Sequence, residues 1–285
     1  MRIFDVLQQR HALQRIRQIP GVRPGLRVID VPIWRRAAGT RHRARMRLVQ
    51  HVSYHLSSHG AEPEISALII ALAKVLPVRT FVDVGANFGY YTWLLRDNAP
   101  REITAHVFEP DPSNVKLIES TLRRRPGRVT LHPVALGLDD GELPFYLDAD
   151  SGHRGSLVEQ PFLEGQVNVA VRPLDSELDA STLPEAILVK IDVEGAEEMV
   201  LAGAERFLEH QPVIVIECYC GSGADKAPAI LSTAGYQLMD AVSGGAVSDA
   251  TNNYLAVPPS VTQAELDLVF AARGEALATR GRHWA

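Results

Sequence analysis

Residues 81–89, which read FVDVGANFG, join an apolar run to a turn of small residues. Asp83 lies within the apolar run, and Gly85 and Gly89 allow the backbone to turn sharply before a helix that begins near Tyr90. In an open α/β sheet, ligands bind beyond the carboxyl ends of the strands, where the first N–H groups of a helix are also free. The pattern therefore predicts a ligand-binding loop at the end of a strand.

The spacing of this turn indicates its ligand. A dinucleotide-binding turn reads G-x-G-x-x-G, and its second glycine makes room for a pyrophosphate. Here Asn87 occupies that position, and Asp83 places a carboxylate at the strand end, where it would repel a phosphate and attract a cation. S-adenosylmethionine carries an ammonium and a sulfonium group and no phosphate, so the charges favour it over NAD as the cofactor.

Two further strand ends complete the predicted donor site. Glu109 closes the next apolar run, 26 residues after Asp83, where an acid accepts hydrogen bonds from ribose hydroxyls. Small residues at 134–137 suit an adenine ring, and Asp139 or Asp140 could accept from its amine, although both also suit a plain surface turn. The predicted donor-binding residues are Asp83, Gly85, Ala86, Asn87, Gly89, Glu109 and Ala135.

Acidic residues follow the fourth apolar run, in KIDVEGAE at 190–197. If the strand continues, its alternation puts Asp192 and Glu194 on one face, beside the methyl donor. A neutral alcohol is a poor nucleophile, and a carboxylate could accept its proton. Alternatively, the two acids could hold a divalent cation that acidifies the hydroxyl. We predict Asp192 and Glu194 as catalytic residues, assign no metal ligand, and expect Glu197 to favour the start of the next helix.

Three other polar residues lie in or next to apolar runs. Glu217 ends the fifth run and could face the same crevice, and Lys190 could pair with one of the acids. His132 lies within an apolar run, where a histidine is more often a core residue with a hydrogen-bond partner than a ligand.

Alternating strands and helices must position these residues. We expect strands at 80–84, 103–108, 129–134, 186–191, 213–218, 236–239 and 254–257. We expect helices at 64–76, 90–97, 112–124, 196–210, 224–234 and 263–278. The alternation predicts an α/β protein with a seven-strand, mostly parallel, doubly wound sheet of the Rossmann-like kind.

The segments outside this alternation define the expected domain organisation. Residues 1–60 predict a basic N-terminal extension of helical character, with an apolar stripe at Leu7, Leu13, Ile16 and Ile19. Residues 61–258 form the main domain, in which 138–175 predict a β-rich insertion, because turn residues separate short alternating runs. Residues 259–285 predict a C-terminal helical tail.

Composition restricts the setting of the protein. The chain has 285 residues, of which 46% are hydrophobic and 22% charged, as in ordinary globular proteins. No apolar stretch reaches the ~20 residues of a membrane-spanning helix, and the N-terminus lacks the apolar region of a signal peptide. The two cysteines, Cys218 and Cys220, are too few for a zinc site and poorly spaced for a disulfide. We therefore expect a cytoplasmic protein with no transmembrane segment.

Arginine is unevenly distributed along the chain. Residues 1–50 contain twelve Arg against Asp5 and Asp30, a net charge of +10, whereas the remainder carries −15. Such an arm could contact an acidic partner, or it could be a solvated face in a chain with 25 Arg and 4 Lys. A transit peptide is also rich in Arg, but it should be rich in Ser, and residues 1–50 contain none.

Six segments carry a family resemblance. They read FVDVGANFGYYT at 81–92, VFEPDPSNVKLIESTL at 107–122, VALGLDDG at 134–141, VRPLDSEL at 171–178, KIDVEGAEEMVLAGA at 190–204 and PVIVIE at 212–217. Together they resemble the FkbM family of S-adenosylmethionine-dependent methyltransferases. The resemblance implies a class I methyltransferase fold, O-methylation of a natural product or glycan, and donor binding at Asp83, Gly85, Asn87, Gly89 and Glu109. It does not identify the catalytic base.

Three rival functions compete with this interpretation. A nucleic-acid methyltransferase would use the basic arm, but the rest of the chain is acidic, and DVEG stands where base-methylating enzymes carry an Asn/Asp-Pro-Pro-aromatic tetrad. A nicotinamide-dependent oxidoreductase is disfavoured by Asn87. A non-enzymatic binding protein on the same fold is disfavoured by the intact donor motif. We expect a small-molecule or glycan acceptor and no stable nucleic-acid partner, with the oligomeric state left open.

Overall fold

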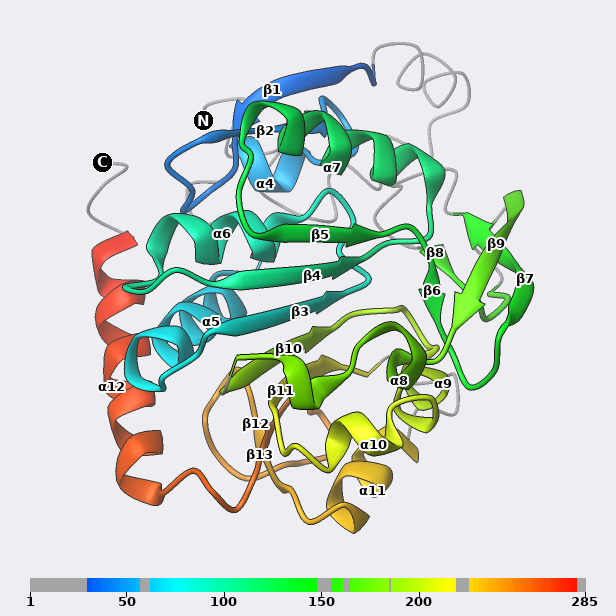
Figure 1. The fold of residues 1–285 in the computed structure, drawn as a ribbon. Coiled ribbons are helices and arrows are strands. Elements are labelled where there is room, and N and C mark those ends of the chain that lie inside the picture. Colours follow the sequence, from blue (N-terminus) through cyan, green and yellow to red (C-terminus); the bar gives the residue numbers. More distant parts are fainter. Residues whose placement is uncertain are drawn as a thin grey trace.

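The structure is a computed structural model, and it describes residues 30–56, 62–147, 155–160, 163, 165–184, 186–218 and 226–280, with only the backbone of 279 and 280. The helix expected around residues 7–19 lies outside the described residues, as do Cys220 and the start of the helix expected at 224–234. Figure 1 shows a central sheet with helices on both faces and a smaller sheet at one side.

The central sheet has seven strands: β3 (Thr80–Val84), β4 (Thr104–Phe108), β5 (Val129–His132), β10 (Ile187–Ile191), β11 (Val213–Glu217), β12 (Gln237–Asp240) and β13 (Asn253–Val257). Their order across the sheet is β12-β13-β11-β10-β3-β4-β5. β13 is antiparallel to both of its neighbours, and the pairings from β11 to β5 are all parallel. The predicted class I methyltransferase fold is confirmed, and the chain direction across the sheet reverses between β3 and β10, where ligands bind in open α/β sheets.

Helices cover the two faces of the sheet because the strand side chains alternate between them. On β3, Phe81 packs with one hydrophobic core, whereas Val82 and Val84 pack with the other. Along the chain the helices are α5 (Pro63–Val75), α6 (Tyr90–Asn98), α7 (Pro112–Arg124), α9 (Glu197–Ala202), α10 (Glu205–Leu208), α11 (Lys226–Thr233) and α12 (Gln263–Arg280). The predicted tail helix, α12, packs against α5 through the buried Leu266 and Val269.

One long helix expected at 196–210 is in fact two, α9 and α10, which meet at Gly203. A Cβ on Gly203 would stand 2.0 Å from the carbonyl oxygen of Gly137, so the break between the two helices lies where the chain packs against the backbone after residue 136. Within the part of the chain that the structure describes, no helix combines the length and apolar character needed to cross a membrane.

The expected β-rich insertion forms a separate sheet of four strands at the side of the central sheet (Figure 1). Its strands are β6 (Ala135–Leu136), β7 (Gly141–Leu147), β8 (Gly155–Ser156) and β9 (Gly165–Arg172), in the order β6-β9-β7-β8. A short helix, α8 (Leu174–Glu177), and a 3-10 turn, η1 (Ala180–Thr182), return the chain to β10.

The helical character expected for the N-terminal extension is wrong for its described part. β1 (Pro32–Arg36) and β2 (Arg43–Arg47) form an antiparallel hairpin, which is followed by the five-residue helix α4 (Val52–Leu56). On β2, Ala44 and Met46 are buried, whereas Arg45 between them is half-buried and Arg43 before them is exposed. This alternation with a period of two is the pattern of a half-buried strand, and the high density of arginine hid it.

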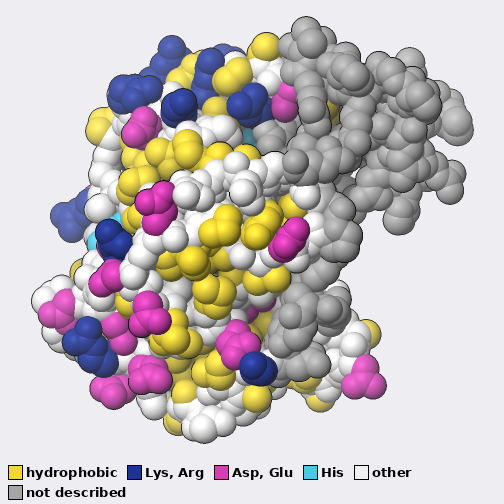
Figure 2. Space-filling view, turned by 90° about the vertical axis from the view of Figure 1, so that its right-hand side faces the viewer, with side chains coloured by type: hydrophobic (Ala, Val, Ile, Leu, Met, Phe, Trp, Pro, Cys, Tyr) yellow, Lys and Arg dark blue, Asp and Glu magenta, His cyan; other side chains and the backbone are white. Residues whose placement is uncertain are grey.

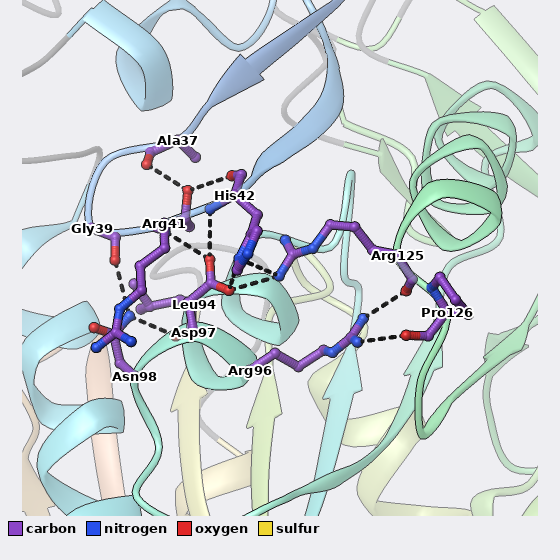
Figure 3. Close-up of polar contacts among 11 residues, drawn as sticks. Ala37, Gly39, Arg41, His42, Leu94, Arg96, Asp97, Asn98, Arg125 and Pro126 are labelled. Carbon is purple, nitrogen blue, oxygen red and sulfur yellow. Dashed lines mark hydrogen bonds and ion pairs between the residues drawn. The ribbon is translucent and has the colours of Figure 1, made fainter.

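The hairpin is held against the main domain by Asp97 of α6 (Figure 3). Its Oδ2 accepts hydrogen bonds from the backbone N–H groups of Arg41 (2.7 Å) and His42 (3.1 Å) in the hairpin turn. Its Oδ1 lies 2.7 Å from the guanidinium of Arg125, at the end of α7, and 2.8 Å from Nδ1 of His42. Burial alone would raise the pKa of Asp97, but the hydrogen bonds from His42 and the charge of Arg125 outweigh it and lower that pKa.

Candidate active site

The predicted binding loop leaves β3 through three residues with left-handed backbone conformations. The φ angles are +77° at Gly85, +55° at Asn87 and +86° at Gly89. The N–H groups of Gly85 and Ala86 donate to the carbonyl of Phe108 at 3.0 and 3.1 Å, which ties the loop to the end of β4. A non-glycine residue rarely adopts such a conformation without a reason, so Asn87 is a strained position within the loop.

Asp83 lies at the end of β3 and is 1% exposed. Its Oδ2 accepts hydrogen bonds from the backbone N–H (3.1 Å) and the hydroxyl (2.6 Å) of Thr92 in α6. Burial raises the pKa of Asp83 to about 6, although Thr92 and the nearby Lys190 oppose that rise. The carboxylate therefore orients the helix that follows the loop, and it becomes more acidic when a cation is near.

Glu109 joins the loop to the second strand. Its Oε2 accepts from the backbone N–H of Asn87 at 2.6 Å, and its Oε1 accepts from the backbone of Asp111 at 2.9 Å and from the amide of Asn114 at 3.4 Å. Burial, and then the charge of Asp111, raise the pKa of Glu109 to about 8. Below that pKa the group is a neutral carboxyl, which offers one O–H donor and its remaining acceptor capacity to ligand hydroxyls.

The loop chemistry fits a cationic nucleoside. Loop residues 84–89 contain no Lys or Arg, and the buried carboxylates of Asp83 and Glu109 lie on either side of the loop. Oδ1 of Asn87 is buried and has no hydrogen-bond partner among the described residues, and such an atom is expected to accept from a ligand. The site therefore has acceptors for an ammonium group and for ribose hydroxyls, and its loop carries no cationic side chain for a phosphate.

Ala135, the last predicted donor-binding residue, starts the short strand β6 and is 6% exposed. It lies three residues beyond His132, whose carbonyl accepts from the N–H of Glu109 at 3.2 Å. Asp139 and Asp140 are exposed, and Asp140 lies 3.4 Å from the guanidinium of Arg172 on β9. That ion pair agrees with the surface-turn interpretation of Asp140.

Asp192 follows β10, directly beside the loop. The N–H of Asp192 donates to the carbonyl of Val84 at 3.0 Å. A Cβ on Gly85 would stand 1.9 Å from the carbonyl oxygen of Asp192. Its Oδ2 lies 3.4 Å from Nζ of Lys190, so the expected pairing of Lys190 with an acid is confirmed. The structure thus brings Asp192 to the loop predicted to bind the donor.

Two more carboxylates meet Asp192. Oxygen atoms of Glu62, Asp192 and Glu217 all lie within 4.8 Å of one another, and all three side chains are half-buried. We call these three residues the acid cluster. Repulsion from Asp192, and then burial, raise the pKa of Glu217 to about 9. Carboxylate oxygens at this spacing could also hold a hard divalent cation such as Mg²⁺.

Lys190 provides a positive charge beside the acid cluster. It is 1% exposed, and its Nζ donates to the carbonyl of Ile191 at 3.1 Å. Burial alone would lower its pKa, but the carboxylates of Asp192, Glu217 and Glu62 outweigh burial and raise it. Its Nζ also lies 5.7 Å from the ring centre of Tyr91, whose hydroxyl donates to Glu62 at 2.5 Å. Lys190 therefore stays charged and compensates part of the negative charge of the cluster.

The strand alternation from which Glu194 was predicted does not extend to this residue, although the charge of Glu194 contributes to the raised pKa of Glu217. β10 ends at Ile191, and Glu194 lies in the following loop with a φ of +53°. Its carbonyl accepts from the amide of Gln160 at 2.6 Å. Glu197 accepts from the N–H of Gly195 at 2.8 Å at the start of α9, which agrees with its expected helix-capping role.

The sequence analysis missed Glu62 and Tyr91 as members of this site. Glu62 precedes α5, and no motif there connects it to the residues after β10 and β11. Glu217, expected to face the crevice, does join Asp192. His132 has core partners as expected, because it stacks on Phe108 with ring centres 4.3 Å apart and lies 2.9 Å from Glu177.

The chain is similar in sequence or structure to three known methyltransferases. It is 26% identical over 155 residues to the hexuronic acid methyltransferase AglP of Haloferax volcanii, an alignment that covers 53% of this chain and 61% of that protein. The crystal structure of an FkbM methyltransferase from Methylobacillus flagellatus is 25% identical, with a TM-score of 0.45, over 63% of this chain and 43% of that one. The human methyltransferase-like protein 13 in complex with SAH is 13% identical, with a TM-score of 0.43, over 76% of this chain and 91% of that one.

The chain therefore spans about three fifths of the length of the curated relative from Haloferax volcanii. The model of the methyltransferase FkbM domain matches residues 83–238, from the carboxylate at the end of β3 to β12. This match includes the loop, Glu109, Asp192 and Glu217, and it covers more than half of the chain. The chain thus belongs to the FkbM methyltransferase family.

Proposed function

We propose that this protein transfers a methyl group from S-adenosylmethionine to a hydroxyl oxygen of a small molecule, natural product or glycan. One observation carries the proposal: Asp192, a carboxylate that can accept a proton, contacts the loop whose acceptors fit a cationic nucleoside. Membership of the FkbM methyltransferase family supports methyl transfer.

The donor would lie across the ends of β3 and β4. Asn87 and Asp83 would accept from its ammonium group, Glu109 would accept from the ribose hydroxyls, and Ala135 would lie along the adenine. Gly85, Ala86 and Gly89 would give the backbone room at the loop. When bound, the donor supplies an electrophilic methyl group on a sulfonium.

Asp192 would act as the general base. The acceptor O–H bond breaks and its proton goes to the carboxylate of Asp192, while the oxygen lone pair forms the new bond to the methyl carbon. The carbon–sulfur bond breaks, and its electron pair stays on sulfur. Lys190, which is buried and charged, lies 3.4 Å from Oδ2 of Asp192 and positions that carboxylate. Glu194 would shape the loop through its backbone and stays the weaker catalytic candidate.

The acceptor class has separate support. The relative AglP is named as a hexuronic acid methyltransferase. We therefore propose a sugar or another polyhydroxylated molecule as the acceptor of this chain. The acceptor oxygen would enter near Glu62 and Tyr91, whose polar atoms could bind neighbouring hydroxyls.

A second candidate mechanism rests on the acid cluster itself. A divalent cation held by Glu62, Asp192 and Glu217 would bind the acceptor oxygen and lower the pKa of its hydroxyl. Chelation distinguishes the two mechanisms, since a cation-dependent enzyme loses turnover in EDTA and regains it with Mg²⁺.

Calorimetry with S-adenosylhomocysteine, followed by a turnover assay on a panel of sugars and phenols, tests the proposed function. We expect binding of the donor product, and formation of S-adenosylhomocysteine from the donor only with a hydroxylated acceptor. Tight binding of NAD in place of the donor product would contradict the proposal.

A further inference from the structure

The described N-terminal hairpin and the end of α7 carry a concentration of arginines. Figure 2 shows Lys and Arg side chains gathered at the top of the molecule, and most acidic side chains in the lower half of the same face. We call these residues the arginine face: Arg35, Arg36, Arg41, Arg43, Arg45 and Arg124. None of them forms an ion pair with a carboxylate of a described residue, so their charges are available to a partner.

The hydrophobic residues of β1 extend this surface. Trp34 is half-buried under the guanidinium groups of Arg124 and Arg45, at 4.1 and 5.7 Å from its ring centre. Val31 is 49% exposed at the start of the same strand, next to the exposed Pro32. Arginine, tryptophan and exposed apolar side chains together are typical of surfaces that lie in the headgroup region of a bilayer.

We propose that the arginine face docks this protein on a membrane surface that contains anionic phospholipids. Each exposed arginine near such a surface contributes about 1 kcal/mol of attraction, which is about fivefold in affinity. Five of the six arginines are exposed, since Arg45 is half-buried, and their charges suffice for reversible binding without any spanning segment.

The hairpin is pre-organised for this contact. Asp97 accepts hydrogen bonds from the backbone N–H groups of Arg41 and His42 in the turn and from the side chain of Arg125 (Figure 3). The backbone of Arg45 also donates to the hydroxyl of Thr121 on α7 at 2.8 Å. On the hairpin, Arg36 and Arg43 are cross-strand partners on the same face as Trp34, whereas Arg35 pairs with the buried Ala44 on the other face. The backbone that carries these arginines is held in place, so little order has to be gained on binding.

The position of this surface leaves the candidate active site open. In Figure 1 the hairpin lies along the top of the molecule beside α7, whereas the carboxyl ends of β3, β4 and β5 point to the right. A bilayer against the hairpin would therefore lie beside the crevice and would not cover it.

A phospholipid surface fits these residues better than a nucleic acid does. Single-stranded nucleic acid binds by stacking bases on aromatic rings, but the ring of Trp34 already has Arg124 over it. Exposed Val31 and Pro32 contribute to a lipid interface and add nothing to a phosphodiester contact.

Vesicle co-sedimentation of the whole chain tests the proposal. We compare vesicles of phosphatidylcholine with vesicles that also contain phosphatidylglycerol, at low and at physiological salt. Binding should require phosphatidylglycerol and should weaken with salt. The double variant Arg36→Gln/Arg43→Gln, which removes two exposed cross-strand partners, should bind about 10- to 30-fold more weakly. The matched control Lys74→Gln/Arg79→Gln removes two exposed charges from elsewhere and should bind like the parent protein.

Several outcomes would overturn the proposal. Equal binding to both kinds of vesicle, or equal losses in the two double variants, would show that the arginine face does not recognise anionic lipid. Retention of RNA or DNA on filters by the parent but not by Arg36→Gln/Arg43→Gln, with no vesicle binding, would assign the face to nucleic acid. Self-association that the same variant abolishes, again without vesicle binding, would assign it to a second copy. None of these readouts depends on methyl transfer.

Discussion

Gly85 lies against the backbone of Asp192: a Cβ on Gly85 would stand 1.9 Å from the carbonyl oxygen and 2.8 Å from the carbonyl carbon of Asp192. The loop after β3 and the loop after β10 therefore touch with no side chain between them. The proposed donor site and the proposed base are parts of one packed unit, because β3 and β10 are neighbouring parallel strands.

Gly85→Ala tests this contact. The φ of +77° is strained for any L-residue, and the new Cβ would force the two loops apart. We expect a loss of at least about 2 kcal/mol in the free energy of unfolding, together with loss of S-adenosylhomocysteine binding. Urea denaturation and calorimetry measure the two effects.

Gly274→Ala is the control for that substitution. Gly274 lies exposed in α12, and a Cβ there would meet nothing within 4 Å. Alanine should therefore stabilise the helix by about 1 kcal/mol. If Gly85→Ala were equally well tolerated, the loops would not be in contact.

Asp192→Asn should separate binding from chemistry. The amide keeps the size of the side chain but cannot accept the acceptor proton, so we expect a loss of about 10²- to 10⁴-fold in kcat and nearly unchanged affinity for the donor product. Steady-state kinetics and calorimetry give the two values. Asp249→Asn removes an exposed carboxylate elsewhere and should change neither. Wild-type turnover by Asp192→Asn would remove this residue from the mechanism.

Glu217→Gln discriminates between a base and a cation at the acid cluster. Glu217 keeps its proton up to a pKa of about 9, because Asp192 repels a second charge. The neutral amide resembles that protonated carboxyl, so general-base catalysis by Asp192 predicts that most turnover remains at neutral pH, with or without EDTA. A deep loss of turnover in Glu217→Gln, together with inhibition of the parent protein by EDTA that Mg²⁺ reverses, would favour the mechanism with a divalent cation at the acid cluster.

Stability should fall as the pH rises, in part because of Glu109. In the folded protein the carboxyl of Glu109 has a pKa of about 8, whereas its ordinary pKa is 4.5. Between these two pH values the folded state therefore binds more protons than the unfolded state. The contribution of Glu109 is therefore full below pH 4.5 and is lost as the pH rises through 8. One such group gives a slope of at most about 1.4 kcal/mol per pH unit.

Urea unfolding of the parent and of Glu109→Gln across that pH window measures this slope. The variant cannot titrate at this position, so its stability should depend less steeply on pH. Parallel stability curves for the two proteins would show that Glu109 is ionised in the folded state.

Asp97→Ala should loosen the hairpin from the main domain. Its carboxylate is buried, with Arg125 and His42 as partners, and removing one member of a buried charged group typically costs about 3–5 kcal/mol. Hydrogen exchange should rise at the amides of Arg41 and His42, which lose their acceptor. Unchanged exchange at those two amides would show that the hairpin is held by other contacts.

Local sequence patterns were enough to predict the parts of the site that lie at strand ends. The run from Asp83 to Gly89 contains its own strand, turn and helix start, and Glu109 closes a strand of similar apolar character. Hydrophobic periodicity and glycine placement are properties of a few neighbouring residues. The order of the strands then brought the carboxyl ends of β3, β4, β10 and β11 to one edge of the sheet.

The remaining features depend on contacts between distant segments, which no local pattern encodes. Glu62 enters the acid cluster because α5 packs beside α6, which carries Tyr91. The helix expected at 196–210 is interrupted at Gly203, whose carbonyl accepts from the N–H of Asp175 at 3.0 Å and which packs on the backbone of Gly137. The strand that contains Lys190 ends at Ile191, so the strand alternation does not extend to Glu194, which has a φ of +53° in the following loop. Short-range periodicity specified the elements and their polar ends, and the packing of those elements selected which carboxylates share a site.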